Sequence, residues 1–250
     1  MPVTLSHMVS MSLRNNLRKG VDNMISAIIV AGGKGKRMGQ KISKQYIRIG
    51  EKEIIARTIE IFQKSKYIDD IVLVVPESDV DFCKRGIVNK YHFTKVKHVI
   101  PGGRERQESV YNGLKYCNPE TELVLIHDGV RPFVDDDIIE KSIEAARKIG
   151  ACTAAVPVKD TIKVIGEDGL SIETPDRSRL WAIQTPQAFK YRLILEAHKK
   201  ALEEGFNGTD DTMLIEHIGY KVKVIEGSYN NIKITTPEDV VFAEAILSKE

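Results

Sequence analysis

Short apolar runs alternate along the chain with segments in which apolar residues recur at helical spacing. The apolar runs predict buried strands at 26–30, 70–75, 97–100, 123–127 and 152–156. The segments 54–64, 80–90, 108–117 and 135–149 have the pattern of helices that pack one face against a sheet. Continuous apolar strands that alternate with helices predict an α/β fold, with a mostly parallel sheet and helices on both faces.

The pattern changes between residues 158 and 181. Runs at 161–165 and 170–174 flank the turn Gly166-Glu-Asp-Gly169, which predicts a hairpin. The hairpin has too few apolar residues for a core unit, so it is either a protruding arm that packs on a partner subunit or an ordinary surface hairpin. A helix at 191–204, a strand at 221–225 and a helix that begins at Thr236-Pro237 complete the pattern.

A glycine-rich segment, Val30-Ala-Gly-Gly-Lys-Gly-Lys-Arg-Met-Gly39, follows the first predicted strand, and Lys44 lies just beyond it. Its glycines leave backbone N–H groups uncovered and its cations add positive charge, which favours a site for nucleotide phosphates. The spacing matches neither a P-loop nor a dinucleotide fingerprint. The alternative is a glycine-rich turn that binds nothing.

Composition narrows the classes of function. The chain has 250 residues and a net charge of +2, too balanced for a general nucleic-acid binder, and no apolar run is long enough to span a membrane. Three scattered cysteines without a CxxC pair argue against a disulfide framework or zinc site and favour a cytoplasmic location. We expect residues 1–23 to be a disordered extension and residues 24–250 to form the folded domain.

Several polar motifs follow predicted strands, where ligands bind in open parallel sheets. Asp128 is placed to hold Mg²⁺ or a ribose hydroxyl, Arg131 to pair with a phosphate or with Asp128 itself, and His127 to serve a structural role. Gly102-Gly103 with Ser109 offers backbone N–H groups and a hydroxyl for a nucleobase, or else simply forms a helix N-cap.

Further candidates lie later in the chain. The pair Asp210-Asp211 is a second candidate for a metal or substrate contact, and Lys233 for a phosphate contact. A charged surface is the alternative for each of them. No Ser-His-Asp, Cys-His or HExxH arrangement occurs, so covalent catalysis has no candidate residue.

Taken together, these motifs resemble one family. They are AGGKGKRMG with SKQY, PGGRERQESV, HDGVRPF, PVKDT, DRSRLWAIQTPQAF, TDD and NIKITTPEDV, and they run in this order from about residue 26 to about residue 247. The chain resembles the 2-C-methyl-D-erythritol 4-phosphate cytidylyltransferases, which use CTP in the non-mevalonate isoprenoid pathway. The resemblance implies a Rossmann-like nucleotidyltransferase fold and a homodimer that interlocks through a β-arm at about 158–181.

The resemblance also implies roles for individual residues. It implies cytosine and ribose contacts from Ala31, Gly32, Gly33, Gly103, Ser109 and Asp128. It implies triphosphate contacts from Arg37, Lys44 and Lys233, and sugar-phosphate contacts from Arg131, Thr161 and Arg177, the last two from the neighbouring subunit. Mg²⁺ is expected beside the α-phosphate, with Asp128 and Asp210 nearby.

The chain departs from the family pattern at three places. Many members have Pro-Ala-Ala-Gly at Val30-Ala-Gly-Gly33, an acid at Arg104 and alanine at Gly129. The Val30–Gly33 version also occurs in D-ribitol-5-phosphate cytidylyltransferases, which is the alternative function, whereas DRSRLWAIQTPQAF favours the erythritol enzymes. A non-catalytic nucleotide-binding regulator is the remote alternative. The predicted reaction needs no general base, because a phosphate monoester is already an anionic nucleophile, and Arg37, Lys44 and Lys233 would stabilise charge at the α-phosphate.

Overall fold

A seven-stranded sheet forms the centre of the computed structural model, which describes residues 24–33 and 43–249. The predictions for residues 1–23 and for Arg37 therefore lie outside the described residues. The strand order is β11-β7-β10-β6-β1-β4-β5, and of these seven strands only β10 runs antiparallel to its neighbours. The strands are β1 (Met24–Val30), β4 (Asp70–Val75), β5 (Val96–Pro101), β6 (Thr121–Asp128), β7 (Ala151–Pro157), β10 (Trp181–Lys190) and β11 (Lys223–Glu226).

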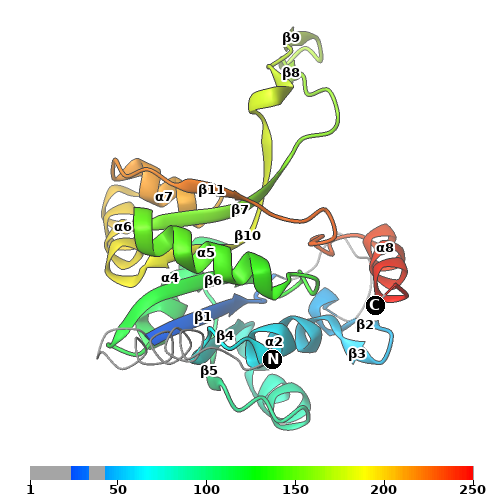
Figure 1. Cartoon of the computed structure of the whole chain (residues 1–250), viewed down its shortest axis with the longest axis vertical. Coiled ribbons are helices and arrows are strands. Elements are labelled where there is room, and N and C mark those ends of the chain that lie inside the picture. The colour runs from blue at the N-terminus through cyan, green and yellow to red at the C-terminus, as the bar shows by residue number, and fades with distance from the viewer. Residues whose placement is uncertain (1–23, 34–42, 250) are drawn as a thin grey trace, which may run out of the picture.

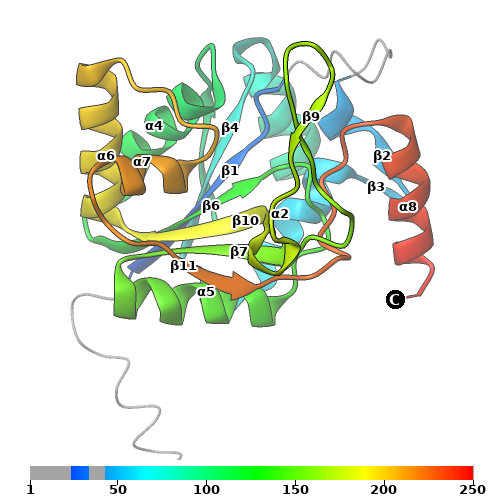
Figure 2. The ribbon, with the colours of Figure 1, turned by 90° about the horizontal axis from the view of Figure 1, so that it is seen from above.

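Helices cover both faces of this sheet, as the alternation of apolar segments predicts (Figure 2). On one face α2 (Ile54–Lys64) and α5 (Asp136–Ile149) pack against alternate strand residues such as Ala27 and Ile29. On the other face α4 (Arg106–Tyr116), α6 (Tyr191–Glu204) and α7 (Asp211–His217) pack against Ile28 and Val30. Because successive strand residues point to opposite faces, β1 belongs to both cores at once.

A third, smaller apolar cluster joins the C-terminal helix to the loops at the edge of the sheet. Helix α8 (Pro237–Leu247) begins at the predicted Thr236 cap and lies beside the short hairpin of β2 (Arg48–Ile49) and β3 (Lys52–Glu53) (Figure 1). Ile49, Val130, Ile234 and Ala243 are buried together there. This cluster fixes the loop that follows β6 and the segment that carries Lys233, because both contribute residues to it.

Strand β10 and helix α7 are the longest of the elements that were not predicted from the sequence. Strand β10 lies between β6 and β7, but its pairing with β7 is interrupted between Ile183 and Gln187. Polar residues and a proline occupy that gap, so the segment lacks the apolar pattern of a central strand. Helix α7 spans only seven residues, and the acid pair that suggested a loop provides its N-cap, Asp210, and its first residue, Asp211.

The segment after β7 forms the predicted hairpin. Strands β8 (Val164–Ile165) and β9 (Ser171–Glu173) pair antiparallel, and the turn η5 (Arg177–Arg179) leads back to β10. Figure 1 shows that this arm projects away from the body of the molecule. Leu170 and Ile172 at its tip are 67% and 71% exposed, respectively. The hairpin prediction is confirmed, whereas its packing on a partner subunit remains a prediction.

Short helical segments complete the path between strands. They are η2 (Lys44–Tyr46), η3 (Glu77–Asp79), α3 (Val80–Phe82) and the π-helical η4 (Cys83–Asn89). All three cysteines are free and buried, as expected for a chain without a disulfide framework. Within residues 24–33 and 43–249, no helix has the length and apolar character needed to cross a membrane.

Candidate functional site

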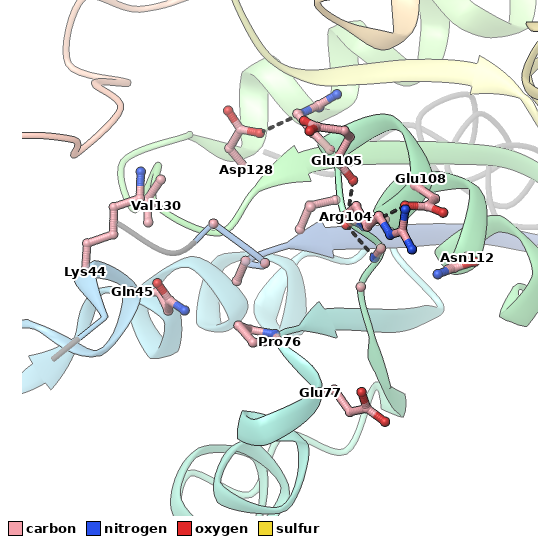
Figure 3. Close-up of a pocket in the computed structure, with 18 of the residues that line it drawn as sticks. Lys44, Gln45, Pro76, Glu77, Arg104, Glu105, Glu108, Asn112, Asp128 and Val130 are labelled. Carbon is pink, nitrogen blue, oxygen red and sulfur yellow. Dashed lines mark hydrogen bonds and ion pairs between the residues drawn. The ribbon is translucent and has the colours of Figure 1, made fainter. Parts of the chain in front are cut away.

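A cavity of about 1020 Å³ opens where β1, β4, β5 and β6 end (Figure 3). This is the edge of the sheet at which the sequence places its polar motifs. Eight of the predicted site residues line it: Ala31, Gly32, Gly33, Lys44, Gly103, Ser109, Asp128 and Lys233. The fold therefore brings together residues from segments that lie as much as 200 positions apart in the chain.

The turn after β1 presents backbone N–H groups to this cavity. The Ala31 N–H donates to the Val74 carbonyl at 2.8 Å, which fixes the start of the turn against β4. The next two residues, Gly32 and Gly33, make no hydrogen bond to any other described residue. A side chain at Gly33 would meet open space, so the backbone there is accessible. Free N–H groups in such a turn are suited to bind an anion.

Ser109 braces a second glycine turn on the opposite wall. Its hydroxyl accepts a hydrogen bond from the Gly103 N–H at 3.0 Å and donates one to the Glu105 carbonyl at 3.0 Å. A Cβ atom at Gly102 would lie only 2.8 Å from the Ser109 hydroxyl oxygen, so the turn passes too close for any larger residue. Ser109 thus braces the turn, whereas the N-cap of α4 is Glu105 rather than the glycine turn that the sequence offered as the alternative. The contact of Ser109 with a nucleotide remains a prediction.

Asp128 lies at the centre of a cluster of three cations. Its carboxylate is 2.7 Å from the Lys233 ammonium, 3.2 Å from Arg106 Nε and 3.8 Å from Arg131 Nε. Burial alone would raise the pKa of Asp128, but the charges of Arg106, Lys233 and Arg131 outweigh burial and hold that pKa well below its usual value. The cluster therefore carries excess positive charge, which favours polyanionic ligands on either side of it.

His127 fixes the turn that carries Asp128 and Arg131. The Asp128 N–H donates to the Thr185 hydroxyl at 3.0 Å, and that hydroxyl lies 3.1 Å from His127 Nδ1. The other ring nitrogen lies 3.0 Å from the Arg131 carbonyl, which can only accept, so Nε2 carries the proton and Nδ1 accepts from Thr185. Burial lowers the pKa of His127 to about 4, in agreement with a neutral ring. The predicted structural role of His127 fits this geometry.

Arg106, an arginine of the PGGRER motif that could contact phosphate or support its loop, connects the cluster to the protein interior. Its Nη1 donates to Asp211 at 2.7 Å, and Asp211 also lies 3.3 Å from His198 Nε2. Asp211 and His198 are each about 1% exposed, and Tyr111 stacks on the His198 ring. Asp211 is thus a buried partner of Arg106 rather than a loop acid. The sequence shows no local sign of a pair that is separated by 105 positions.

A second cavity of about 430 Å³ lies on the other side of the cluster and shares Arg106, Asp128 and Lys233 with the first. Arg131 and Asp210 line this second cavity. Arg131 Nη1 donates to the Asn231 carbonyl at 2.7 Å, but its buried Nε has no hydrogen-bond partner among the described residues. An unsatisfied guanidinium N–H beside a cavity is a binding group for an anion.

Asp210 caps helix α7, so its oxygens are already engaged. They accept hydrogen bonds from the Met213 N–H, the Thr212 hydroxyl and the Gln187 amide at 2.8–2.9 Å. No group of three or more His, Cys, Asp or Glu residues that could hold a metal occurs within 24–33 and 43–249. The described residues do not form a protein-built metal cage, and Asp128 is the predicted metal ligand with access to both cavities.

Thr161 and Arg177 lie on the arm, and neither lines either cavity. Both side chains are exposed, and Arg177 donates one hydrogen bond, at 2.7 Å, to the Lys159 carbonyl. Within one chain the structure therefore does not bring these two residues to the other predicted site residues.

Comparison with known proteins gives a consistent result. The family described as 2-C-methyl-D-erythritol 4-phosphate cytidylyltransferase matches residues 25–249. A protein of that name from Alkaliphilus oremlandii is 52% identical over 89% of this chain and 94% of its own length. The 4-diphosphocytidyl-2C-methyl-D-erythritol synthase structure from Anaerococcus prevotii has a TM-score of 0.80 at 41% identity, covering 90% of this chain and 96% of that chain. The Thermus thermophilus cytidylyltransferase structure has a TM-score of 0.75 at 29% identity, covering 90% and 99% of the two chains.

Proposed function

Because the chain belongs to the 2-C-methyl-D-erythritol 4-phosphate cytidylyltransferase family, we propose that it transfers the cytidylyl group of CTP to 2-C-methyl-D-erythritol 4-phosphate, with release of pyrophosphate. One observation of the site carries the proposal: a cluster of three cations around Asp128 separates two cavities. Such an arrangement is suited to hold two polyanions side by side, which is the main requirement of phosphoryl transfer between them.

CTP would occupy the larger cavity. The N–H groups of Gly32 and Gly33, which bond to no other described residue, are suited to bind its phosphates together with Lys44 and Lys233, and the braced turn at Gly103 is suited to hold the nucleoside. Arg37, which lies outside the described residues, is the third triphosphate contact that we propose.

The sugar phosphate would occupy the smaller cavity, with its phosphate near the guanidinium of Arg131. Thr161 and Arg177 are too exposed on the arm to complete this site from within one chain. We therefore propose a homodimer in which each arm reaches into the partner's site, and the exposed apolar side chains of the arm support this arrangement.

In the proposed reaction an oxygen of the sugar phosphate attacks the α-phosphorus of CTP. A new P–O bond forms there, while the bond from the α-phosphorus to the bridging oxygen breaks and pyrophosphate leaves. The nucleophile is already an anion, so no residue has to remove a proton. His127 is unsuited to that task, because its ring is buried and both nitrogens are hydrogen-bonded. The chain's own contribution is positioning by the turns and charge stabilisation by Lys44 and Lys233.

Mg²⁺ bound to the triphosphate would neutralise part of its charge when present. Asp128 is the residue that would contact it, in exchange for one of its cationic partners, because it lines both cavities whereas Asp210 caps α7 and lines only the smaller one. The site therefore fits a cation that arrives with the nucleotide better than a resident one. The three buried, free cysteines are consistent with the cytoplasmic location that we propose.

The test is Mg²⁺-dependent pyrophosphate release from CTP, with 2-C-methyl-D-erythritol 4-phosphate and D-ribitol 5-phosphate measured side by side. We expect a strong preference for the erythritol substrate and little release with UTP in place of CTP. A preference for D-ribitol 5-phosphate would identify that compound as the acceptor substrate instead. No pyrophosphate release with either acceptor would contradict the proposed function.

A further inference from the structure

Gln45 has a buried carboxamide without a hydrogen-bond partner. Its side chain is 0% exposed, and neither Nε2 nor Oε1 is bonded to any residue in the described part of the chain. A buried polar group without a partner loses its hydrogen bonds to water and gains none in return, so such groups are rare and require an explanation. Gln187 is buried to the same extent, yet its amide bonds to Thr153, Asp210 and Asp211. Burial alone therefore does not explain why the Gln45 carboxamide has no hydrogen-bond partner among the described residues.

Tyr46, the next residue in the turn η2, fixes the position of the Gln45 backbone. The Tyr46 hydroxyl donates to Asp79 at 2.8 Å, and its ring packs edge-on against Phe82 with the ring centroids 5.0 Å apart. The backbone N–H groups of Tyr46 and Ile47 close the turn on Ser43 and Lys44. Gln45 therefore sits on an anchored turn, where its side chain has a defined place.

That place is the wall of the larger cavity. Gln45 lines the cavity together with Lys44, Gly32 and Gly33. In Figure 3 its carboxamide lies between the labelled Lys44 and Pro76, below the end of β1. The unsatisfied amide and the free N–H groups of the glycine turn thus line one cavity, next to the lysine predicted to bind the triphosphate.

The surrounding groups determine what the amide can bind. Lys44 and the N–H groups of Gly32 and Gly33 are hydrogen-bond donors, and Pro76 has no N–H to offer. Glu77 lies at the outer rim of the cavity with an exposed side chain. The NH₂ of Gln45 has no acceptor among the described residues, and an anionic ligand bound among these donors would supply one.

We propose that the Gln45 amide donates a hydrogen bond to a β- or γ-phosphate oxygen of CTP, and this inference rests on the proposed function. Gln45 is then a further nucleotide-binding residue, which remains unsatisfied until the triphosphate enters. It contributes to affinity for the nucleoside triphosphate and gives no advantage to the monophosphate.

The first test is thermal unfolding of Gln45→Met without ligand, with Gln187→Met as the matched control. Methionine keeps the length of the side chain and removes the polar atoms. Because the amide of Gln45 is unsatisfied, we expect its replacement to raise Tm by roughly 2–4 °C. Gln187→Met should lower Tm, because it leaves its three partners unpaired. A fall in Tm for both variants would show that Gln45 is structural and overturn the inference.

The second test is the affinity of wild type and Gln45→Met for CTP and for CMP. Loss of one hydrogen bond to a charged phosphate should raise the Kd for CTP about 10-fold or more, while the Kd for CMP changes less than about twofold. Gln45→Glu should bind CTP more weakly still, because it replaces the donor with a negative charge. Unchanged affinity for CTP, or equal losses for CTP and CMP, would overturn the inference. Failure of the wild type to bind CTP would instead contradict the proposed function.

Discussion

The cation cluster around Asp128 and the projecting arm are built in opposite ways. The Asp128 carboxylate at the centre of the cluster is buried, and it has three cationic neighbours within 4 Å, from α4, the turn after β6 and the segment before α8. The arm exposes its apolar residues, and its two predicted substrate contacts, Thr161 and Arg177, reach neither cavity of their own chain. A single chain therefore supplies every residue of the ion cluster. The arm, by contrast, has the features expected of a segment that contacts another subunit.

Variants of the cluster and variants of the arm should therefore differ in their effects on activity and on stability. Changes in the cluster should damage both the chemistry and the stability of each chain, because its charges compensate one another in a buried place. Changes on the arm should affect the use of the sugar phosphate and leave the stability of the chain almost unaltered, because the arm side chains concerned are exposed.

Loss of either lysine predicted to bind the triphosphate should have the largest effect. Lys44→Ala and Lys233→Ala are each expected to lower kcat by about 10²–10³, as found when one preorganised donor to a developing negative charge is removed. Steady-state pyrophosphate release measures this. Lys64→Ala, which removes an exposed lysine paired with Glu60, is the control and should retain normal turnover. Near-normal turnover in Lys44→Ala or Lys233→Ala would remove that lysine from the proposed site.

The free energy of unfolding of the chain should depend on pH through the protonation of His127. Its pKa is about 4 in the folded chain and about 6.5 when unfolded, so the unfolded state binds the proton more readily. The free energy of unfolding should therefore be highest above about pH 6.5 and fall as the pH decreases toward 4, by on the order of 3 kcal/mol. Urea unfolding across this range measures it, with His127→Gln as the comparison. The same pH dependence in both proteins would contradict the neutral, buried ring.

Arg177→Ala on the arm should mainly change the KM for the sugar phosphate, and this effect should be smaller than the loss of kcat in the lysine variants. We expect the KM for the sugar phosphate to rise about 10–100-fold, since a hydrogen bond to a charged group contributes about 1.5–3 kcal/mol. The Tm should stay within about 1 °C of wild type, because Arg177 is exposed. Lys163→Ala, which changes another exposed cation of the arm, should leave KM unchanged. A marked loss of Tm in Arg177→Ala would mean that the arm is part of the folded core.

The sequence predicts those elements whose apolar residues form a continuous run or recur at helical spacing. The predictions of β1, β4 and β6 and of the helices beside them are confirmed. It does not predict β10, because the polar side chains of Gln184, Thr185 and Gln187 are buried against the loops rather than exposed. The glycine turns and Asp128 could be predicted because each follows an apolar run that ends at the same edge of the sheet. Arg106 with Asp211 could not, because their pairing depends on how α4 and α7 pack together.

The central claim is that each arm completes the site of the partner subunit. The direct measurement is the activity of a purified mixed dimer that contains one Lys44→Ala chain and one Arg177→Ala chain, assayed at low sugar-phosphate concentration. In such a dimer one site carries both changes and the other carries neither, so we expect about half of the wild-type activity, far above that of either parent dimer. Activity no higher than the mean of the two parent dimers, or a chain that forms no dimer, would contradict the account.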